Sequence, residues 1–136
     1  MTTTPSNPVD LFLDAVGAGR GVPSSIYTED ATLDATVPHW RLEAHGPQPI
    51  AAQLSCWFAD PATFSELSRT EVGGGELVSF VLSWEENGQP WAAHQAHVLS
   101  VVDGRIAHQQ VWCGGRWPAA LMAEIEQGLE SARATA

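Results

Sequence analysis

Apolar side chains recur every three or four positions in two segments, and this spacing predicts two helices. The first helix begins at Pro8 and is ended by the Gly- and Pro-rich stretch after Val16. The second opens near Gly46-Pro47 and closes at Asp60-Pro61. The apolar faces are Val9, Phe12, Leu13 and Val16, and then Ile50, Leu54, Trp57 and Phe58. A short helix rich in Ala and Glu is expected over about Ala119–Arg133.

Elsewhere the period is close to two, which predicts β-strands. Thr32–Val37 and Trp40–Ala44 predict a hairpin between the two helices. Four longer strands are expected at Phe64–Val72, Leu77–Glu85, Trp91–Val102 and Arg105–Cys113. Asn87-Gly88 and Asp103-Gly104 are hairpin turn signals, and Gly114-Gly115 is expected to end the last strand.

This order predicts an α+β fold, in which N-terminal helices pack on one face of a curved antiparallel sheet of about five to six strands. A curved sheet with helices across its mouth forms a cone and encloses a pocket. Residues 1–7 are expected to be a disordered tail, residues 8–118 a single domain, and residues 119–136 a C-terminal helix and tail.

The negative net charge of the chain argues against anionic binding partners. Six Arg and no Lys stand against sixteen Asp and Glu in 136 residues, a net charge of −10. The Arg residues are scattered, so nucleic acid and anionic membranes are not expected partners. The absence of Lys also excludes Schiff-base chemistry. The polar first residues lack the pattern of a secretory signal, which predicts a cytoplasmic protein. Cys56 and Cys113 are expected to be free, buried thiols.

Several short segments, in order, resemble the nuclear transport factor 2 (NTF2)-like domains of the SnoaL and ketosteroid isomerase group over about residues 8–117. These segments are Tyr27-Thr28-Glu29-Asp30-Ala31-Thr32-Leu33, His45-Gly46 with Ile50-Ala51-Ala52, Asn87-Gly88-Gln89-Pro90 and Asp103-Gly104-Arg105-Ile106. The scaffold hosts isomerases, dehydratases, cyclases, epoxide hydrolases and binding modules, so the resemblance predicts the fold more sharply than the function.

The catalytic positions of the steroid isomerases are not matched here. The position of their helical Tyr falls at Leu11 or Phe12, and that of their base at Ala35, next to Asp34. The position of their oxyanion-hole acid falls at His97. Steroid isomerisation by that mechanism is therefore not expected.

If the resemblance holds, alternate residues of three strands and one face of the second helix line the pocket. The inward strand residues are Val78, Phe80, Leu82 and Trp84; Ala93, Gln95, His97 and Leu99; and Gln109, Val111 and Cys113, covered by Leu54, Trp57 and Phe58. Phe12 and Trp40 complete the predicted substrate-binding set. The predicted polar groups of this apolar pocket are Gln95, His97 and Gln109, a layout typical of small-molecule sites.

His97 is the first candidate for a general base or acid, and Gln95 and Gln109 are candidates to stabilise an oxyanion. The alternative is a core histidine that is hydrogen-bonded to a neighbouring Gln. His39 is a second acid/base candidate, although its segment can also be a loop with an aromatic plug. Asp34 faces outward under strict alternation and would enter the pocket only through a bulge. Asp14 on the first helix is a further possibility.

His94 and His97 are three residues apart on a strand, so their side chains point to opposite faces and no metal site is expected. Arg116-Trp117 is expected to plug the end of the barrel rather than bind a substrate carboxylate. The resemblance implies a homodimer through the outer sheet face, where His94, His108 and Trp112 are expected.

These features predict a small-molecule enzyme that acts on an apolar, cyclic substrate by acid/base proton transfer, as an isomerase, cyclase or dehydratase, without a cofactor. The alternative is a non-catalytic ligand-binding or dimerisation module of the same fold. Epoxide hydrolysis is a third possibility, and it would require Asp34 or Asp14 to face the pocket.

Overall fold

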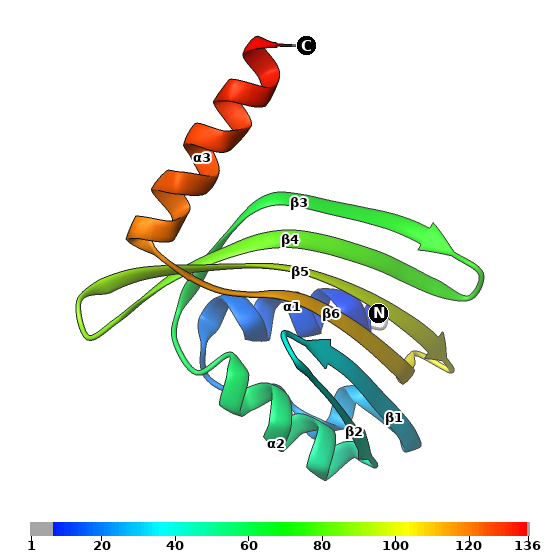
Figure 1. Ribbon diagram of the computed structural model, residues 1–136. Coiled ribbons are helices and arrows are strands. Elements are labelled where there is room, and N and C mark those ends of the chain that lie inside the picture. Colours follow the sequence, from blue (N-terminus) through cyan, green and yellow to red (C-terminus); the bar gives the residue numbers. More distant parts are fainter. Residues whose placement is uncertain (1–6, 136) are drawn as a thin grey trace, which may run out of the picture.

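A computed structural model describes residues 7–135 as a curved six-stranded sheet with two helices against one face and a third that projects away (Figure 1). The helices are α1 (Pro8–Ala18), the 3-10 turn η1 (Ser24–Ile26), α2 (Pro47–Trp57) and α3 (Ala119–Ala134). The strands are β1 (Tyr27–Val37), β2 (Trp40–His45), β3 (Ala62–Val72), β4 (Gly75–Glu86), β5 (Gln89–Val102) and β6 (Arg105–Pro118). Their order in the sheet is β2-β1-β6-β5-β4-β3. The predicted α+β cone is confirmed.

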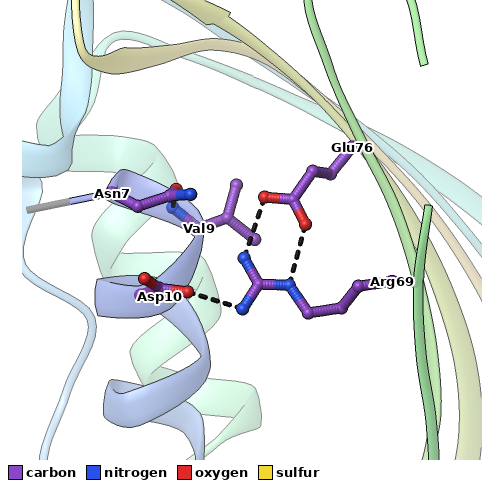
Figure 2. Close-up of polar contacts among 5 residues, drawn as sticks. All are labelled: Asn7, Val9, Asp10, Arg69 and Glu76. Carbon is purple, nitrogen blue, oxygen red and sulfur yellow. Dashed lines mark hydrogen bonds and ion pairs between the residues drawn. The ribbon is translucent and has the colours of Figure 1, made fainter. Parts of the chain in front are cut away.

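Helix α1 forms where the apolar spacing predicts it and has a cap at each end. The Asn7 side chain accepts a hydrogen bond from the Val9 amide at 2.8 Å (Figure 2), and Gly19 ends the helix with φ 63°. A Cβ at Gly19 would lie 2.2 Å from the backbone of Asp60, so this close approach also requires glycine. Asn7 was expected in the tail and instead caps the helix; residues 1–6 lie outside the described part of the chain.

The core lies between the concave face of the sheet and helices α1 and α2. Strand alternation is as predicted: Ala93, Gln95, His97 and Leu99 are buried along β5, and the intervening His94 is exposed. The helices contribute Val9, Phe12, Val16, Ile50 and Leu54 to the same cluster. The apolar faces of the two helices and of the strands therefore pack against one another in one core.

One strand pair differs from the antiparallel sheet that the sequence predicts. Strand β1 pairs with β6 in parallel, with Ala35 opposite Val111, so the sheet is mixed. Hairpin turns fix the direction of strands that follow one another, but residues 38–104 lie between β1 and β6. No turn signal in the sequence specifies the direction of such a long-range pair.

The expected end of the last strand at Gly114-Gly115 is wrong. Strand β6 continues to Pro118, and Trp117 pairs with Ala92 on β5. The pairing register shifts between Ala93 and Gln95, and Gly115 has φ 109°. The glycines therefore accommodate an irregularity within the strand and do not end it.

Helix α3 leaves the sheet directly after β6 and projects away from the body (Figure 1). None of its described residues is buried. Among residues 7–135, no helix combines the length and the hydropathy that a membrane-spanning segment needs.

Candidate functional site

A cavity of about 590 Å³ opens between the C-terminal end of α2, the β1–β2 turn and the ends of β4, β5 and β6. Its walls are mainly apolar and include the side chains of Trp57, Phe58, Leu82 and Trp84. The polar or charged side chains on its lining are Cys56, Asp60, Glu86, Gln95, Cys113 and Arg116. Both cysteines are free, but Cys56 is exposed and Cys113 is partly exposed, so the expectation that they are buried is wrong. An apolar cavity of this size with a few polar groups is typical of a site for a small organic molecule.

The structure divides the predicted substrate-binding residues into three groups. Trp57, Phe58, Leu82, Trp84 and Cys113 are on the lining of this cavity. Phe12, Leu54, Val78, Phe80 and Val111 are instead packed in the core, and Trp40 is 70% exposed on β2. Phe12 and Phe80 therefore fill the interior beside His97 and do not face this cavity.

A continuous series of side-chain hydrogen bonds joins the core to the cavity wall. The Tyr27 hydroxyl donates to Gln109 Oε1 at 2.6 Å, and Gln109 Nε2 donates to His97 Nδ1 at 2.9 Å. The other ring nitrogen, His97 Nε2, lies 2.9 Å from Gln95 Oε1. Gln95 Nε2 then donates to Cys113 Sγ at 3.4 Å. We call Tyr27, Gln109, His97, Gln95 and Cys113 the polar chain.

His97 is the middle of the polar chain and has no exposed surface. Its ring stacks on Phe80, with centroids 5.5 Å apart, and lies 5.2 Å from the ring of Phe12. Burial lowers the pKa of His97 to about 3, so the imidazole is neutral near pH 7. His97 is not among the residues that line the cavity, whereas Gln95 is. Burial also raises the pKa of Tyr27 well above its ordinary value, so the Tyr27 hydroxyl keeps its proton near neutral pH.

The predicted carboxylates Asp34 and Asp14 and the predicted His39 are not on the cavity lining. Asp34 lies on the outer side of β1 and accepts two hydrogen bonds from Arg41, at 2.9 and 2.6 Å. These hydrogen bonds lower the pKa of Asp34, which keeps it ionised. His39 is exposed in the turn between β1 and β2, with φ 63°, and Asp14 is exposed on α1.

Two acidic side chains of the cavity were not predicted from the sequence. Asp60 follows α2, where the sequence indicated only a helix boundary. Glu86 is two residues beyond Trp84, so the period of β4 already places both on one face, a signal that could have identified it.

At the mouth of the cavity, Glu86 accepts hydrogen bonds from Trp84 Nε1, at 2.9 Å, and from the Arg116 guanidinium. These two donors, Trp84 first, lower the pKa of Glu86. The Arg116 guanidinium also lies 4.9 Å from the ring centroid of Trp91. The Glu86 carboxylate and the Trp91 ring thus hold Arg116 at the mouth of the cavity.

No model of a known protein family matches the chain, and no curated protein matches it. Solved structures do match along most of its length. An NTF2-like protein of unknown function from Mesorhizobium loti superposes with a TM-score of 0.61 at 17% identity, covering 85% of this chain and 97% of that one. The chain has the NTF2-like fold.

Two further structures with this fold carry functional or ligand information. One is a Catenulispora acidiphila protein with a ketosteroid isomerase-like fold in complex with trimethylamine (TM-score 0.59, 15% identity, 82% of this chain and 88% of that one). The other is a Sinorhizobium meliloti protein named as a polyketide cyclase (TM-score 0.56, 21% identity, 78% and 94%). At these identities the likeness establishes the NTF2-like fold alone.

Proposed function

We propose that the cavity binds a small, apolar, ring-containing carbonyl compound and catalyses proton transfer on it without a cofactor, as an isomerase, cyclase or dehydratase does. The observation that carries the proposal is that the amide of Gln95 and the carboxyl group of Asp60 line one apolar cavity. A hydrogen-bond donor and a carboxylate are the two groups that enolisation requires.

The chemistry assigns one role to each group. Asp60 takes a proton from the carbon next to the ligand carbonyl. The electrons of that C–H bond form a C=C bond to the carbonyl carbon, and the π electrons of the C=O bond move to the oxygen. A Gln95 N–H stabilises the resulting oxyanion. Return of the proton from Asp60 to another carbon gives isomerisation. Attack of the enolate carbon on a second carbonyl, whose oxygen then takes the proton from Asp60, gives cyclisation. Departure of a hydroxyl group from the carbon next to the enolate, as water formed with that proton, gives dehydration. We assign the base to Asp60 because His97, the candidate from the sequence, has no surface in the cavity.

The comparisons support an isomerase or cyclase function at the level of the fold, and they do not bear on the role of Asp60. One structural neighbour is named as a polyketide cyclase, and another, from Bacillus subtilis, is named as an isomerase.

We propose in addition that the protein is a homodimer through the outer face of the sheet. Trp112 on β6 is 40% exposed there, and His94 is exposed on the adjacent strand. A large aromatic side chain on a sheet face is a common feature of protein interfaces.

The test uses 1-indanone as the probe, because it is a small bicyclic ketone with exchangeable protons next to the carbonyl. Binding is measured by calorimetry, and proton transfer is measured by NMR as deuterium uptake at the α-carbon in D2O. Ala93→Leu should abolish binding, because Ala93 is buried on the cavity lining and a larger side chain fills the space. Ala96→Leu is the matched control, because Ala96 is on the opposite face of the same strand.

Asp60→Asn tests the base. It should leave 1-indanone binding in place and remove the catalysed deuterium uptake. Binding that Ala93→Leu abolishes, without any catalysed uptake in the native protein, would instead support a binding module. Binding that is equal in Ala93→Leu and Ala96→Leu would show that the ligand occupies another site.

A further inference from the structure

The polar chain has a direction, and that direction decides what the cavity offers to a ligand. A side-chain amide presents either an oxygen, which accepts, or an NH2 group, which donates, and a neutral imidazole has one nitrogen of each kind. Reversing Gln109, His97 and Gln95 together would keep the hydrogen bonds among these three residues. The ends of the polar chain must therefore determine the direction.

Tyr27 is the end that can determine it. Its side chain is buried, and its hydroxyl lies 2.6 Å from Gln109 Oε1, the one acceptor found for it among the described residues. If Gln109 were reversed, its NH2 group would face the hydroxyl and the Tyr27 proton would have no acceptor. A buried donor without an acceptor costs about 1–3 kcal/mol, which would leave the reversed arrangement below about a sixth of the population.

The other end of the polar chain, at Cys113, favours one direction of the hydrogen bonds only weakly. Cys113 Sγ receives hydrogen bonds from Gln95 Nε2 and from the Gly115 amide, each at 3.4 Å. A thiol is both a weak acceptor and a weak donor, so it could face either side of the Gln95 amide.

From Tyr27, each hydrogen bond fixes the next. Because Gln109 Oε1 accepts from Tyr27, Gln109 Nε2 faces His97 Nδ1 and donates to it. The ring proton of His97 is then on Nε2, which donates to Gln95 Oε1. Gln95 is left with its NH2 group toward Cys113 and the cavity wall. One of its two hydrogens bonds to Cys113, and the second is available to a ligand.

We infer that Tyr27, through Gln109 and His97, fixes Gln95 as a hydrogen-bond donor and so makes the cavity selective for ligands that present an acceptor oxygen. Tyr27, Gln109 and His97 are thus positioning residues, since Gln95 alone among the four is on the cavity lining. The direction of the polar chain does not depend on the proposed reaction, whereas the ligand preference rests on the proposed function of the cavity.

The direction is tested by the tautomer of His97, measured from the 15N shifts of its ring nitrogens. The native protein should show the form protonated on Nε2. In Tyr27→Phe either direction leaves one group of Gln109 unpaired, so the form protonated on Nδ1 should appear at a comparable population. A native protein protonated on Nδ1, or a Tyr27→Phe protein that keeps the Nε2 form alone, would overturn the inference. The native spectrum tests the direction even if the variant does not fold.

Thr32→Val is the matched control. It also removes a hydroxyl of β1 that bonds to a β6 side chain, since Thr32 Oγ1 lies 2.5 Å from His108 Nδ1. That pair is outside the polar chain, so the His97 tautomer should not change. A tautomer shift of the same size in Thr32→Val would show that the effect is a general loss of packing between the two strands.

Ligand preference is measured with 1-indanone, which only accepts at its oxygen, and indole, which donates through its N–H. If about half of Tyr27→Phe adopts the reversed direction, 1-indanone should bind about twofold more weakly and indole at least about threefold more tightly. Thr32→Val should keep the native preference. An unchanged preference despite a changed tautomer would contradict the selectivity. Absence of binding by both probes, with the Nε2 tautomer present, would refute the proposed cavity function and leave the direction of the polar chain intact.

Discussion

The neutral imidazole of His97 links the stability of the protein to pH. Its pKa is about 3 in the folded protein because of burial, against about 6.5 for an unperturbed histidine. The unfolded chain therefore binds a proton that the folded protein does not, at every pH between these values. The stability that this residue contributes is fully present above about pH 6.5 and is lost as the pH falls toward 3.

We predict that this residue makes the free energy of unfolding fall by about 1.4 kcal/mol per pH unit below about pH 6.5. His97→Gln should flatten the profile, because the variant has no proton to bind. The measurement is urea unfolding at several pH values between about 4.5 and 6.5, above the range in which carboxylates dominate. His45→Gln is the control, because the side chain of His45 is 69% exposed. Equal slopes in the native and His97→Gln proteins would contradict the prediction.

The sequence predicted which side chains face inward but not how deep they lie. The two-residue alternation of the strands predicted Gln95, His97 and Gln109 on the inner face of the sheet, and all three are buried. This alternation could not show that Phe12 and Phe80 enclose His97 while Gln95 reaches the cavity. The depth of a side chain below the surface depends on how α1 packs across the sheet. Asp60 was missed for a related reason: a helix boundary has no period from which a facing direction can be predicted.

At the scale of elements, one arginine joins a helix to the two strands at the sheet edge (Figure 2). Arg69 on β3 donates to Asp10 on α1 at 2.5 Å, and to both carboxylate oxygens of Glu76 on β4 at 2.7 and 2.8 Å. The Arg69 side chain is 33% exposed and that of Glu76 is 14% exposed, so this group of charges is partly shielded from water. The Arg69 hydrogen bonds lower the pKa of Glu76.

We predict that Arg69→Gln lowers the free energy of unfolding by about 1–2 kcal/mol, because two neighbouring carboxylates lose their counter-charge. Arg41→Gln is the matched control: it breaks a two-bond ion pair with Asp34, but the Arg41 side chain is 65% exposed. Its effect should be below about 1 kcal/mol and weaker still in high salt. Chemical denaturation of the two variants compares them directly, and an equal loss in both would argue against a special role for the Arg69 contacts.

Elements that follow local rules were predicted, and those that depend on distant partners were not. The spacing of apolar residues and the turn dipeptides gave both N-terminal helices and the hairpins. Strand β6 passes through Gly114-Gly115 because β5 continues to pair with it, as in the pair of Ala92 with Trp117. The parallel β1–β6 pair likewise joins strands that are separated along the chain by residues 38–104.

For the whole molecule, the order of elements was enough to predict the fold, but the same scaffold carries many functions. Residues on the cavity lining decide the chemistry, and several of them come from loops or strand ends that have little local signal. Asp60 and Arg116 are examples. Large apolar side chains are also exposed on the surface. Trp112 is exposed on the outer face of the sheet, and Leu121 and Leu129 are exposed on α3, none of whose described residues is buried.

An exposed tryptophan on a sheet face favours association with a second copy, because burial of its ring removes a large apolar area from water. We predict that the protein has twice the mass of the 14.6 kDa chain in light scattering. Trp112→Glu should give a monomer, because a carboxylate would be buried without a partner at the interface. Trp40→Glu is the matched control: Trp40 is more exposed, at 70% against 40% for Trp112, but it is on the edge strand β2. A monomeric native protein would contradict the prediction. A dimer that Trp40→Glu disrupts and Trp112→Glu does not would place the interface elsewhere than the outer face of β5 and β6.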